Sequence, residues 1–428
     1  MKIQELHLKN FRGFEHRSFK FHDRLTLVVG ENGSGKTCLL EGLSVALGGW
    51  ICGFDGLESQ DRRNIIKADR RAIIANANNA LLEQIPMDVM CVAMMQSGES
   101  LQWSRGLTSL NGRTTTGGLC QVRRLSETFS KKIHSGFDSN IVLPVVAYYS
   151  AARLWNEPIQ RERSIKRDKI RLAGYRRALA FSNSIKDTMS YIDRLSYLAY
   201  GDGDQGSLAK MKAVTNAIKT SLESVEPDVD VFYDRKLAEF CVRKSNGEVK
   251  PYSLLSDGYR GVSSLIIDIC RRIMMLNPQL GELAIKETGG VVLIDEIDLH
   301  LHPRWQQKVL SDLLRVFPKL QFIATTHAPS VIQSARSENL MILNGESVNY
   351  PSRDVYGRDV NSILTDIMDA KVRPEAVEQR FQSIYDHISA GNISSATHEL
   401  SELEQIVGEN DAELSGIRVT IDLETLGV

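Results

Sequence analysis

Short apolar runs and helical periodicities at the two ends of this chain predict an α/β fold. The run Arg24–Val29 is typical of a buried strand, and it is followed by a glycine-rich turn. From Lys36 to Leu47 the leucines recur at helical spacing, and Gly48-Gly49 is expected to end that helix. Much later, Gly290–Ile294 and Leu320–Thr326 predict two further buried strands. A parallel sheet built from distant parts of the chain is therefore expected.

The middle and the end of the chain follow other patterns. Turn signals at Ser97-Gly98 and Asn111-Gly112 predict β-hairpins within residues 87–116. Residues 158–222 have a helical and mostly polar pattern, and another hairpin is expected within residues 229–243. A polar helical pattern returns at residues 375–403. These segments predict insertions and appendages around the α/β core.

Composition and charge exclude several classes of protein. The 428 residues suggest two or three domains, and a formal net charge of −1 excludes a strongly basic nucleic-acid protein as a description of the whole chain. No apolar run approaches the ~20 residues of a membrane helix, and the first residues lack the apolar stretch of a signal peptide. The six cysteines form no CxxC pair. We therefore expect a cytoplasmic protein that does not bind a membrane.

A phosphate-binding loop stands between the first buried strand and the first helix. Its sequence matches GxxxxGK[ST] and reads Gly30-Glu31-Asn32-Gly33-Ser34-Gly35-Lys36-Thr37. Backbone N–H groups of such a glycine-rich loop curve around a phosphate, and the helix N-terminus adds its dipole. Lys36 is expected to reach the β- and γ-phosphates of ATP, and the Thr37 hydroxyl is expected to ligate Mg²⁺. A chance match in a chain of this length is about one in fifty.

Acidic and imidazole side chains follow the two later strands. Asp295 and Glu296 come directly after one strand, and His327 follows the next. Parallel strands carry functional residues at their carboxyl ends. We expect Asp295 to hold Mg²⁺ through water, Glu296 to act as the general base on the attacking water, and His327 to sense the γ-phosphate. Apolar strands that end in acidic residues are common, and a lone histidine is often structural, so these roles depend on the phosphate loop.

The segment Leu254–Gly261 gives the motifs a family context. A serine before a helix is by itself a good N-cap. Its place between the phosphate loop and the acidic strand, however, resembles the LSxG signature of ABC-type ATPases. That resemblance implies that Ser256 and Gly258 contact the γ-phosphate of ATP bound to a second copy, in a head-to-tail dimer. It also implies that Asn32 faces the γ-phosphate, as in the SMC-like branch.

Two further similarities narrow the family. The opening Leu6–Phe14 resembles the NFRGF-type start of the SMC, RecF and OLD branch. Segments 148–155, 254–261 and 295–305 resemble bacterial AAA-type ATPases of anti-phage defence, most of all the ATPase subunits of Septu systems, which partner an HNH nuclease. The resemblance covers residues 1 to about 345. It implies an ABC-type P-loop head with a mixed sheet and an antiparallel lobe.

The implied domain organisation has three parts. Residues 1–157 and 226–350 form the ATPase head, residues 158–225 form an inserted helical arm, and residues 351–428 form a C-terminal helical segment that serves oligomerisation or partner docking. The implied function is an ATP-binding and ATP-hydrolysing regulatory subunit that controls a separate nuclease. A RecF- or SMC-like DNA repair ATPase, which binds DNA without cutting it, is the alternative. An OLD-like nuclease is disfavoured, because no Asp-x-Asp pair follows His327.

A basic segment and a pair of histidines can each be interpreted in two ways. Residues 161–177 hold eight Lys or Arg, which form either a solvated helix face or a strip that binds DNA phosphates. His300 and His302 follow the acidic strand, where they either pack a loop that crosses to a second copy or ligate a metal. We expect the first interpretation for the histidines, so that ATP-bound Mg²⁺ is the only metal predicted.

Overall fold

The computed structural model divides the chain into two compact units, Met1–Arg358 and Asp359–Val428, and each is considered by itself. The structure describes residues 1–75, 80–136, 141–151, 171–180, 185–345, 347–351 and 354–426. The predicted division into a head, an inserted arm and a C-terminal segment stays a prediction. No helix in the described ranges is both long and apolar enough to cross a bilayer.

A six-stranded sheet forms the centre of the first unit, in the order β15-β14-β3-β13-β12-β8. The five strands from β14 to β8 run parallel, and only β15 is antiparallel to its neighbour. The strands are β3 (Leu25–Gly30), β8 (Val145–Tyr149), β12 (Gly290–Ile294), β13 (Leu320–Thr326), β14 (Leu340–Asn344) and β15 (Ser347–Asn349). The predicted α/β class and its strands are confirmed, and β3, β12 and β13 lie side by side with β13 in the middle.

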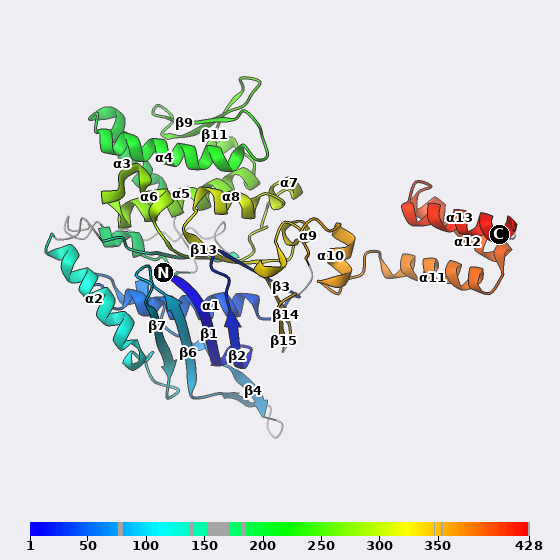
Figure 1. Cartoon of the computed structure of the whole chain (residues 1–428), viewed down its shortest axis with the longest axis horizontal. Coiled ribbons are helices and arrows are strands. Elements are labelled where there is room, and N and C mark those ends of the chain that lie inside the picture. Colours follow the sequence, from blue (N-terminus) through cyan, green and yellow to red (C-terminus); the bar gives the residue numbers. More distant parts are fainter. Residues whose placement is uncertain are drawn as a thin grey trace. The chain divides into compact units, whose positions relative to one another are not determined.

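An antiparallel sheet lies on the other side of helix α1 (Lys36–Ile51) (Figure 1). Its order is β2-β1-β6-β7, and α1 contacts strands of both sheets. The strands are β1 (Lys2–Phe11), β2 (Phe14–Lys20), β6 (Met87–Met94) and β7 (Ser100–Leu107); a separate hairpin pairs β4 (Ala72–Ala75) with β5 (Ala80–Glu83). Because α1 is covered on both sides, nearly all of its residues are buried.

Gly48 and Gly49 do not end α1, contrary to the prediction from sequence, because the helix continues to Ile51. A Cβ at Gly48 would lie 1.9 Å from the carbonyl oxygen of Arg62, and one at Gly49 would lie 2.8 Å from the Leu119 side chain. The two glycines are therefore positions of close packing. Glycine is required at these positions because segments outside the helix approach it closely, and not because the chain turns there.

The segment that follows β7 also differs from the prediction. Ser97-Gly98 closes the β6–β7 hairpin as expected. A turn forms at Asn111-Gly112, but it leads into a 3₁₀ helix at Gly117–Leu119 and then into α2 (Cys120–His134). The turn signal was correct, but the strand expected after it does not form.

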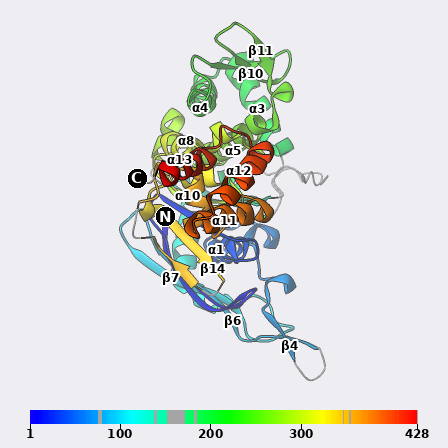
Figure 2. The ribbon, with the colours of Figure 1, turned by 90° about the vertical axis from the view of Figure 1, so that its right-hand side faces the viewer.

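Helices cover the opposite face of the central sheet. Figures 1 and 2 show α5 and α8 against this face, and α3, α4 and the small sheet β9–β11 farther out. The predicted hairpin at residues 229–243 is confirmed as β9 and β10. The helices are α3 (Ile185–Ser196), α4 (Gln205–Leu222), α5 (Asp257–Leu276), α6 (Ala284–Glu287), α7 (Pro303–Gln306), α8 (Val309–Val316) and α9 (Pro329–Ile332). The outer strands are β9 (Asp230–Asp234), β10 (Glu239–Arg243) and β11 (Val249–Pro251).

A buried carboxylate ties α5 to its neighbours. Asp268 in α5 accepts hydrogen bonds from Tyr149 of β8 at 2.8 Å and from Thr188 of α3 at 2.7 Å. Arg271 and Arg272 form ion pairs with the same carboxylate. Burial opposes its ionisation, but the two guanidinium groups keep the pKa of Asp268 far below its usual value. The start of α5 is thus carried by a helix that is fixed to the sheet.

The basic segment 161–177 is only partly described, because residues 161–170 lie outside the described ranges. Its later part forms a 3₁₀ helix at Arg171–Tyr175 in which every residue is buried. The Arg171 guanidinium donates to the carbonyl oxygens of Leu276 and Ile141. Arg171 therefore stabilises the fold and offers no surface to DNA.

The second unit is a small helical bundle with its own core. It contains α10 (Val360–Asp366), α11 (Glu375–Ser389), α12 (Ile393–Val407) and α13 (Ala412–Leu426). The helical pattern predicted at residues 375–403 is confirmed, with a break between α11 and α12. The buried core comprises Phe381, Ile384, Ala396, Leu400, Leu403, Leu414, Ile417 and Ile421.

Candidate functional site

The phosphate loop joins the end of β3 to the start of α1, as its sequence predicted. Gly33 and Gly35 have φ angles of +82° and +99°, which residues other than glycine rarely adopt. A Cβ at Gly35 would also lie 2.6 Å from the Phe14 ring of β2. Ser34 is 9% exposed, and its Oγ is buried with no hydrogen-bond partner among the described residues. A buried hydroxyl of this kind needs an acceptor, which a phosphate oxygen can provide.

Lys36 begins α1, and its ammonium lies inside the loop. Its Nζ donates to the carbonyl oxygens of Gly30 at 2.8 Å and Glu31 at 2.7 Å. Burial lowers the pKa of Lys36, and nearby carboxylates, led by Asp295 and Glu296, partly oppose this shift. The cation is therefore placed between the loop and the acidic end of β12.

Thr37 and Asp295 meet directly, although 258 positions separate them. The Thr37 hydroxyl donates to Asp295 Oδ2 at 3.0 Å. Asp295 is 3% exposed, and its Oδ1 also accepts a hydrogen bond from Thr325 Oγ1 at 2.7 Å. The pair presents a hydroxyl oxygen and a carboxylate beside the loop, and these are oxygen donors that Mg²⁺ prefers.

Glu296 stands at a bend directly after β12. Its φ is +47°, in a region that costs a non-glycine residue about 1–3 kcal/mol. Its backbone N–H donates to Thr325 Oγ1 at 2.8 Å, so the Thr325 hydroxyl organises both acidic residues. Sequence reasoning missed Thr325 and its neighbour Thr326, which donates to Asp298 at 2.5 Å. A polar pair at the carboxyl end of a buried strand was the available signal.

His327 follows β13 and faces the same group of charges. It interacts electrostatically with Lys36 and with the carboxylates of Glu296, Asp295 and Asp298. Burial, followed by the Lys36 charge, lowers its pKa below the usual value for histidine. This shift favours the neutral form of the imidazole. The structure thus brings Lys36, Thr37, Asp295, Glu296 and His327 to one edge of the sheet.

Two of the remaining predicted ligands, Ser256 and Gly258, lie away from the phosphate loop at the start of α5, and the third, Asn32, lies in the loop itself. Ser256 precedes α5, is exposed, and makes no side-chain capping bond to the helix. A Cβ at Gly258 would lie 3.2 Å from the carbonyl oxygen of His300, so the signature segment packs against the loop that follows β12. Asn32 is exposed at the tip of the phosphate loop. In the described ranges no hydrogen bond or ion pair joins Ser256 to the phosphate loop.

His302 has a structural partner in this loop. Its Nδ1 accepts a hydrogen bond from the N–H of Arg304 at 3.3 Å, which caps the start of α7. Within the described part of the chain, no group of three or more His, Cys, Asp or Glu side chains is arranged to hold a metal ion.

Arg12, which directly follows β1, belongs to a cluster of charged residues that contacts the helix after the phosphate loop. Arg12 pairs with Glu41 of α1 and with Asp69, which also receives two hydrogen bonds of 2.9 Å from Arg63. Burial raises the pKa of Glu41 to about 7, although both arginines oppose the shift. Glu41 lies one helical turn after Thr37, so this cluster fixes the first turns of α1.

A pocket adjoins the phosphate loop on the side of the antiparallel sheet. Phe14, His16 and Arg17 line it from β2, together with Gly33–Gly35 of the loop and Arg71. An aromatic ring, an imidazole and two guanidinium groups therefore border the place where the loop can hold phosphates.

Two family models match the chain. A model described as an AAA domain matches residues 5–229, which include the phosphate loop. A second, described as an AAA domain of a putative AbiEii toxin of a type IV toxin–antitoxin system, matches residues 138–333, which include Asp295, Glu296 and His327.

Relatives match over most of the chain. The retron Vc95 probable ATPase of Vibrio cholerae serotype O1 biovar El Tor is 24% identical over 87% of this chain and 80% of its own length. The retron Ec83 probable ATPase of Escherichia coli is 26% identical over 87% and 77%. The Septu protein PtuA of Bacillus thuringiensis is 24% identical over 84% and 79%. Among solved structures, the SMC head domain from Thermotoga maritima matches at a TM-score of 0.44 and 18% identity, over 82% of this chain and all of that one.

Proposed function

The chain belongs to the family of AAA domains and is an ATPase, and from that premise we propose that it is the ATP-hydrolysing regulatory subunit of an anti-phage defence complex. In this proposal two copies associate head to tail around ATP and control a separate nuclease of the HNH type. The contact between Thr37 and Asp295 beside the phosphate loop carries the catalytic part of the proposal. The relatives named as Septu and retron proteins support the defence part.

Each residue of the site has a defined task in hydrolysis. Backbone N–H groups of the loop and the Ser34 hydroxyl hold phosphate oxygens, and Lys36 turns from the loop carbonyls toward the β- and γ-phosphates. Thr37 and Asp295 hold Mg²⁺, which when bound neutralises charge on the phosphates. The nucleoside lies in the adjoining pocket beside Phe14.

Glu296 accepts a proton from the attacking water as the general base. Its backbone has a left-handed conformation, which the Thr325 hydroxyl holds by accepting a hydrogen bond from the backbone N–H of Glu296. The imidazole of His327 donates a hydrogen bond to the γ-phosphate, and its electrostatic interactions with Lys36 and Glu296 support this role.

The signature segment completes the site of a second copy. The Ser256 hydroxyl is exposed and not used as a helix cap, and Gly258 lets the start of α5 pack closely against the loop that follows β12. In a head-to-tail dimer, Ser256, Gly258 and the start of α5 then reach the γ-phosphate bound by the partner, whose Asn32 contacts the same group. Each of the two sites therefore needs residues of both copies.

Complementation between two inactive variants tests this arrangement. Lys36→Ala and Ser256→Arg are each expected to be inactive, whereas an equimolar mixture recovers roughly a quarter of the wild-type ATPase rate. About half of the dimers are then mixed, and each has one intact composite site out of two. The rate of phosphate release measures the recovery. If mixed dimers form, as shown by pull-down of differently tagged copies, and no activity returns, the site does not act between copies as proposed.

The second unit provides a docking surface for a basic partner. From Asp359 onward the chain contains 14 Asp or Glu and 4 Lys or Arg, an excess of ten acidic residues. Each of the four basic residues already pairs with a carboxylate inside the unit. Glu402 and Glu404 are engaged in such pairs, so exposed carboxylates such as Glu378, Glu409 and Glu424 would meet the partner.

A nuclease assay tests the division of labour. The purified chain is expected to hydrolyse ATP and to leave plasmid DNA uncut in Mg²⁺ or Mn²⁺, whereas addition of the proposed partner nuclease is expected to produce nicks. Deletion from Pro374 onward should weaken the association in pull-down assays while ATP hydrolysis is retained. Cleavage by the chain alone that a substitution outside the ATP site abolishes would contradict the proposal, as would undiminished association of the truncated chain.

A further inference from the structure

Helix α13, the last helix of the second unit, is apolar on two opposite faces (Figure 1). Leu414, Ile417 and Ile421 belong to the buried core of the bundle. A second set of small and apolar residues follows at steps of four, three and four positions, which places its members on one face of a helix. With about 3.6 residues per turn, this face lies opposite the core. We call it the outer stripe, and it consists of Ala412, Gly416, Val419 and Leu423.

The outer stripe is accessible to solvent. Val419 is 57% exposed and Leu423 is 47% exposed, and Ala412 and Gly416 are exposed as well. A surface helix usually has one apolar stripe, which faces the core of its own domain. Single exposed apolar residues are common, but a row of them along about three turns is the pattern by which one helix recognises another. The outer stripe is therefore a candidate docking face.

Gly416 lies in the middle of α13 and within the outer stripe. Glycine inside a helix is less favourable than alanine, because it loses more backbone entropy on folding. A Cβ at Gly416 would meet no described atom of this chain within 4 Å. Packing among the described residues therefore does not require a glycine there. Close approach by a helix of another molecule accounts for it, because the distance between packed helices depends on the side chains at their contact.

Carboxylates border the outer stripe on both sides. By helical position Asp422 lies on one side of it and Glu424 on the other, and both residues are exposed. Among the described residues of the second unit, no hydrogen bond or ion pair engages either carboxylate. Arg418 is the only lysine or arginine of α13, and it already pairs with Glu404 of α12. The border of the stripe is therefore negative.

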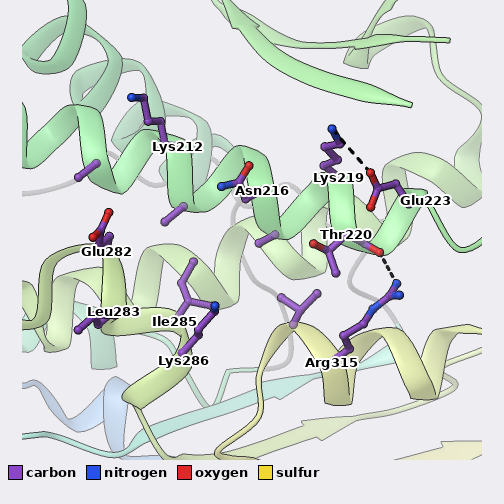
Figure 3. A pocket seen from close by; sticks show the side chains of 14 residues that line it. Lys212, Asn216, Lys219, Thr220, Glu223, Glu282, Leu283, Ile285, Lys286 and Arg315 are labelled. Carbon is purple, nitrogen blue, oxygen red and sulfur yellow. Dashed lines mark hydrogen bonds and ion pairs between the residues drawn. The ribbon is translucent and has the colours of Figure 1, made fainter. Parts of the chain in front are cut away.

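A pocket of the first unit, between α4 and the helices α6 and α8, has a different distribution of charge (Figure 3). Lys219 lies 3.6 Å from Glu223, and the Arg315 guanidinium donates to the carbonyl oxygen of Thr220. The ammonium of Lys212 lies on the side of α4 away from the cavity. Cations and carboxylates both line this pocket, so it presents no surface of one sign. The outer stripe, in contrast, combines an apolar centre with a border of one sign.

These charges distinguish between two possible occupants of the outer stripe. If the stripe paired with the same stripe of a second copy, carboxylates of both copies would border the contact, and like charges across an interface oppose association. A helix with lysine or arginine on both sides of its apolar residues would bring opposite charges to Asp422 and Glu424. Such complementary charges at the rim of an interface select the partner.

We propose that the outer stripe of α13 docks an amphipathic helix of a partner protein, with basic residues on both sides of the apolar face of that helix. Val419 and Leu423 are the apolar anchors, and the small residues Ala412 and Gly416 let the two helices approach closely. The inference rests on the proposed function in one respect, namely that the second unit docks a basic partner. It adds the docking face and the form of the partner.

Binding of fluorescently labelled peptides to the full chain tests the proposal. The probe is a helical peptide of about 18 residues, with leucines at the same spacing and lysines on both sides of them. The lysine peptide should bind, and Val419→Ser with Leu423→Ser should weaken its binding at least about 10-fold, because the apolar contact is lost. Asp422→Asn with Glu424→Gln should weaken it about 3-fold or more at low salt and less at high salt.

The controls separate the outer stripe from general effects. A comparison peptide with glutamate in place of each lysine should bind at least about 10-fold more weakly than the lysine peptide. Val372→Ser with Ile406→Ser removes two exposed apolar side chains of the same unit outside α13, and binding of the lysine peptide to this variant should be unchanged. None of the substituted residues belongs to the core of the bundle, so thermal unfolding of every variant should match that of the wild type.

Three results would overturn the proposal. The first is absence of binding by the lysine peptide to a chain whose thermal unfolding is intact. The second is equal binding of the two peptides, or equal weakening in the stripe variant and its control. The third is a dimer of the nucleotide-free chain in sedimentation that only the stripe variant dissociates, because a second copy would then occupy the stripe.

The peptide assay and the nuclease assay fail independently. If the lysine peptide binds as expected and the partner nuclease does not associate, the proposed function is contradicted and the docking face stands. If the nuclease associates equally with the wild type and with the variant Val419→Ser with Leu423→Ser, the inference about α13 is contradicted and the proposed function stands.

Discussion

Replacement of Glu296 by glutamine is expected to slow ATP hydrolysis about 10²–10⁴-fold and to leave ATP binding intact, since a general base usually contributes a factor of this size. Glutamine has nearly the same shape as glutamate but cannot accept the proton of the attacking water. The backbone N–H bond to Thr325 does not involve the substituted side chain, so the left-handed bend should persist. Steady-state phosphate release gives the rate, and titration with a fluorescent ATP analogue gives the affinity.

Glu338→Gln is the matched control, because Glu338 is an exposed glutamate in the same unit and lies outside the site. It should hydrolyse ATP at the wild-type rate. A Glu296→Gln variant that also hydrolysed at the wild-type rate would remove Glu296 from the role of general base. A variant that lost ATP binding as well would indicate a role for this carboxylate in holding the nucleotide.

Replacement of Lys36 by alanine is expected to weaken ATP binding at least about 100-fold, and hydrolysis is lost with it. Lys36 is the only lysine or arginine in the GxxxxGK[ST] loop, and charge-assisted hydrogen bonds to two phosphates amount to about 3–6 kcal/mol. The fold should survive, because within the described part of the chain the ammonium donates hydrogen bonds only to the carbonyl oxygens of Gly30 and Glu31. Calorimetric titration with ATP and Mg²⁺ measures the affinity.

Lys308→Ala provides the comparison, because Lys308 is exposed and is not one of the residues assigned to ATP. Its affinity for ATP should match that of the wild type, and circular dichroism should show the same unfolding temperature for both variants within a few degrees. If Lys36→Ala bound ATP as tightly as the wild type, the nucleotide would not lie in the loop that the lysine closes.

The chemistry of the candidate site could be predicted from the sequence because its parts are local. The phosphate loop requires glycines at positive φ within eight consecutive residues, and Gly33 and Gly35 have such angles. The acidic residues needed only a buried strand before them, and Asp295 directly follows β12. That parallel strands place their carboxyl ends together is a general rule, which is why Thr37 and Asp295 could be expected to approach each other.

Other features depended on contacts between distant segments. Gly48 looked like a helix terminus, but the carbonyl oxygen of Arg62 occupies the space of its missing Cβ, and the helix continues. The sequence placed Arg171 in a possible basic surface, whereas the structure shows its guanidinium donating hydrogen bonds to the carbonyl oxygens of Leu276 and Ile141. A local sequence pattern indicates which secondary structure a segment favours, but not which distant segment will pack against it or accept its hydrogen bonds.

The sequence by itself therefore determined the class of the fold, the phosphate loop and the acidic strand, because the backbone conformation of a loop and the burial of a strand depend on residues that are adjacent in sequence. Only the tertiary structure decided that Thr325 holds both Asp295 and the backbone of Glu296. This arrangement joins residues that are 29 and 30 positions apart. Packing between elements sets such distances, and no periodicity within a segment encodes them.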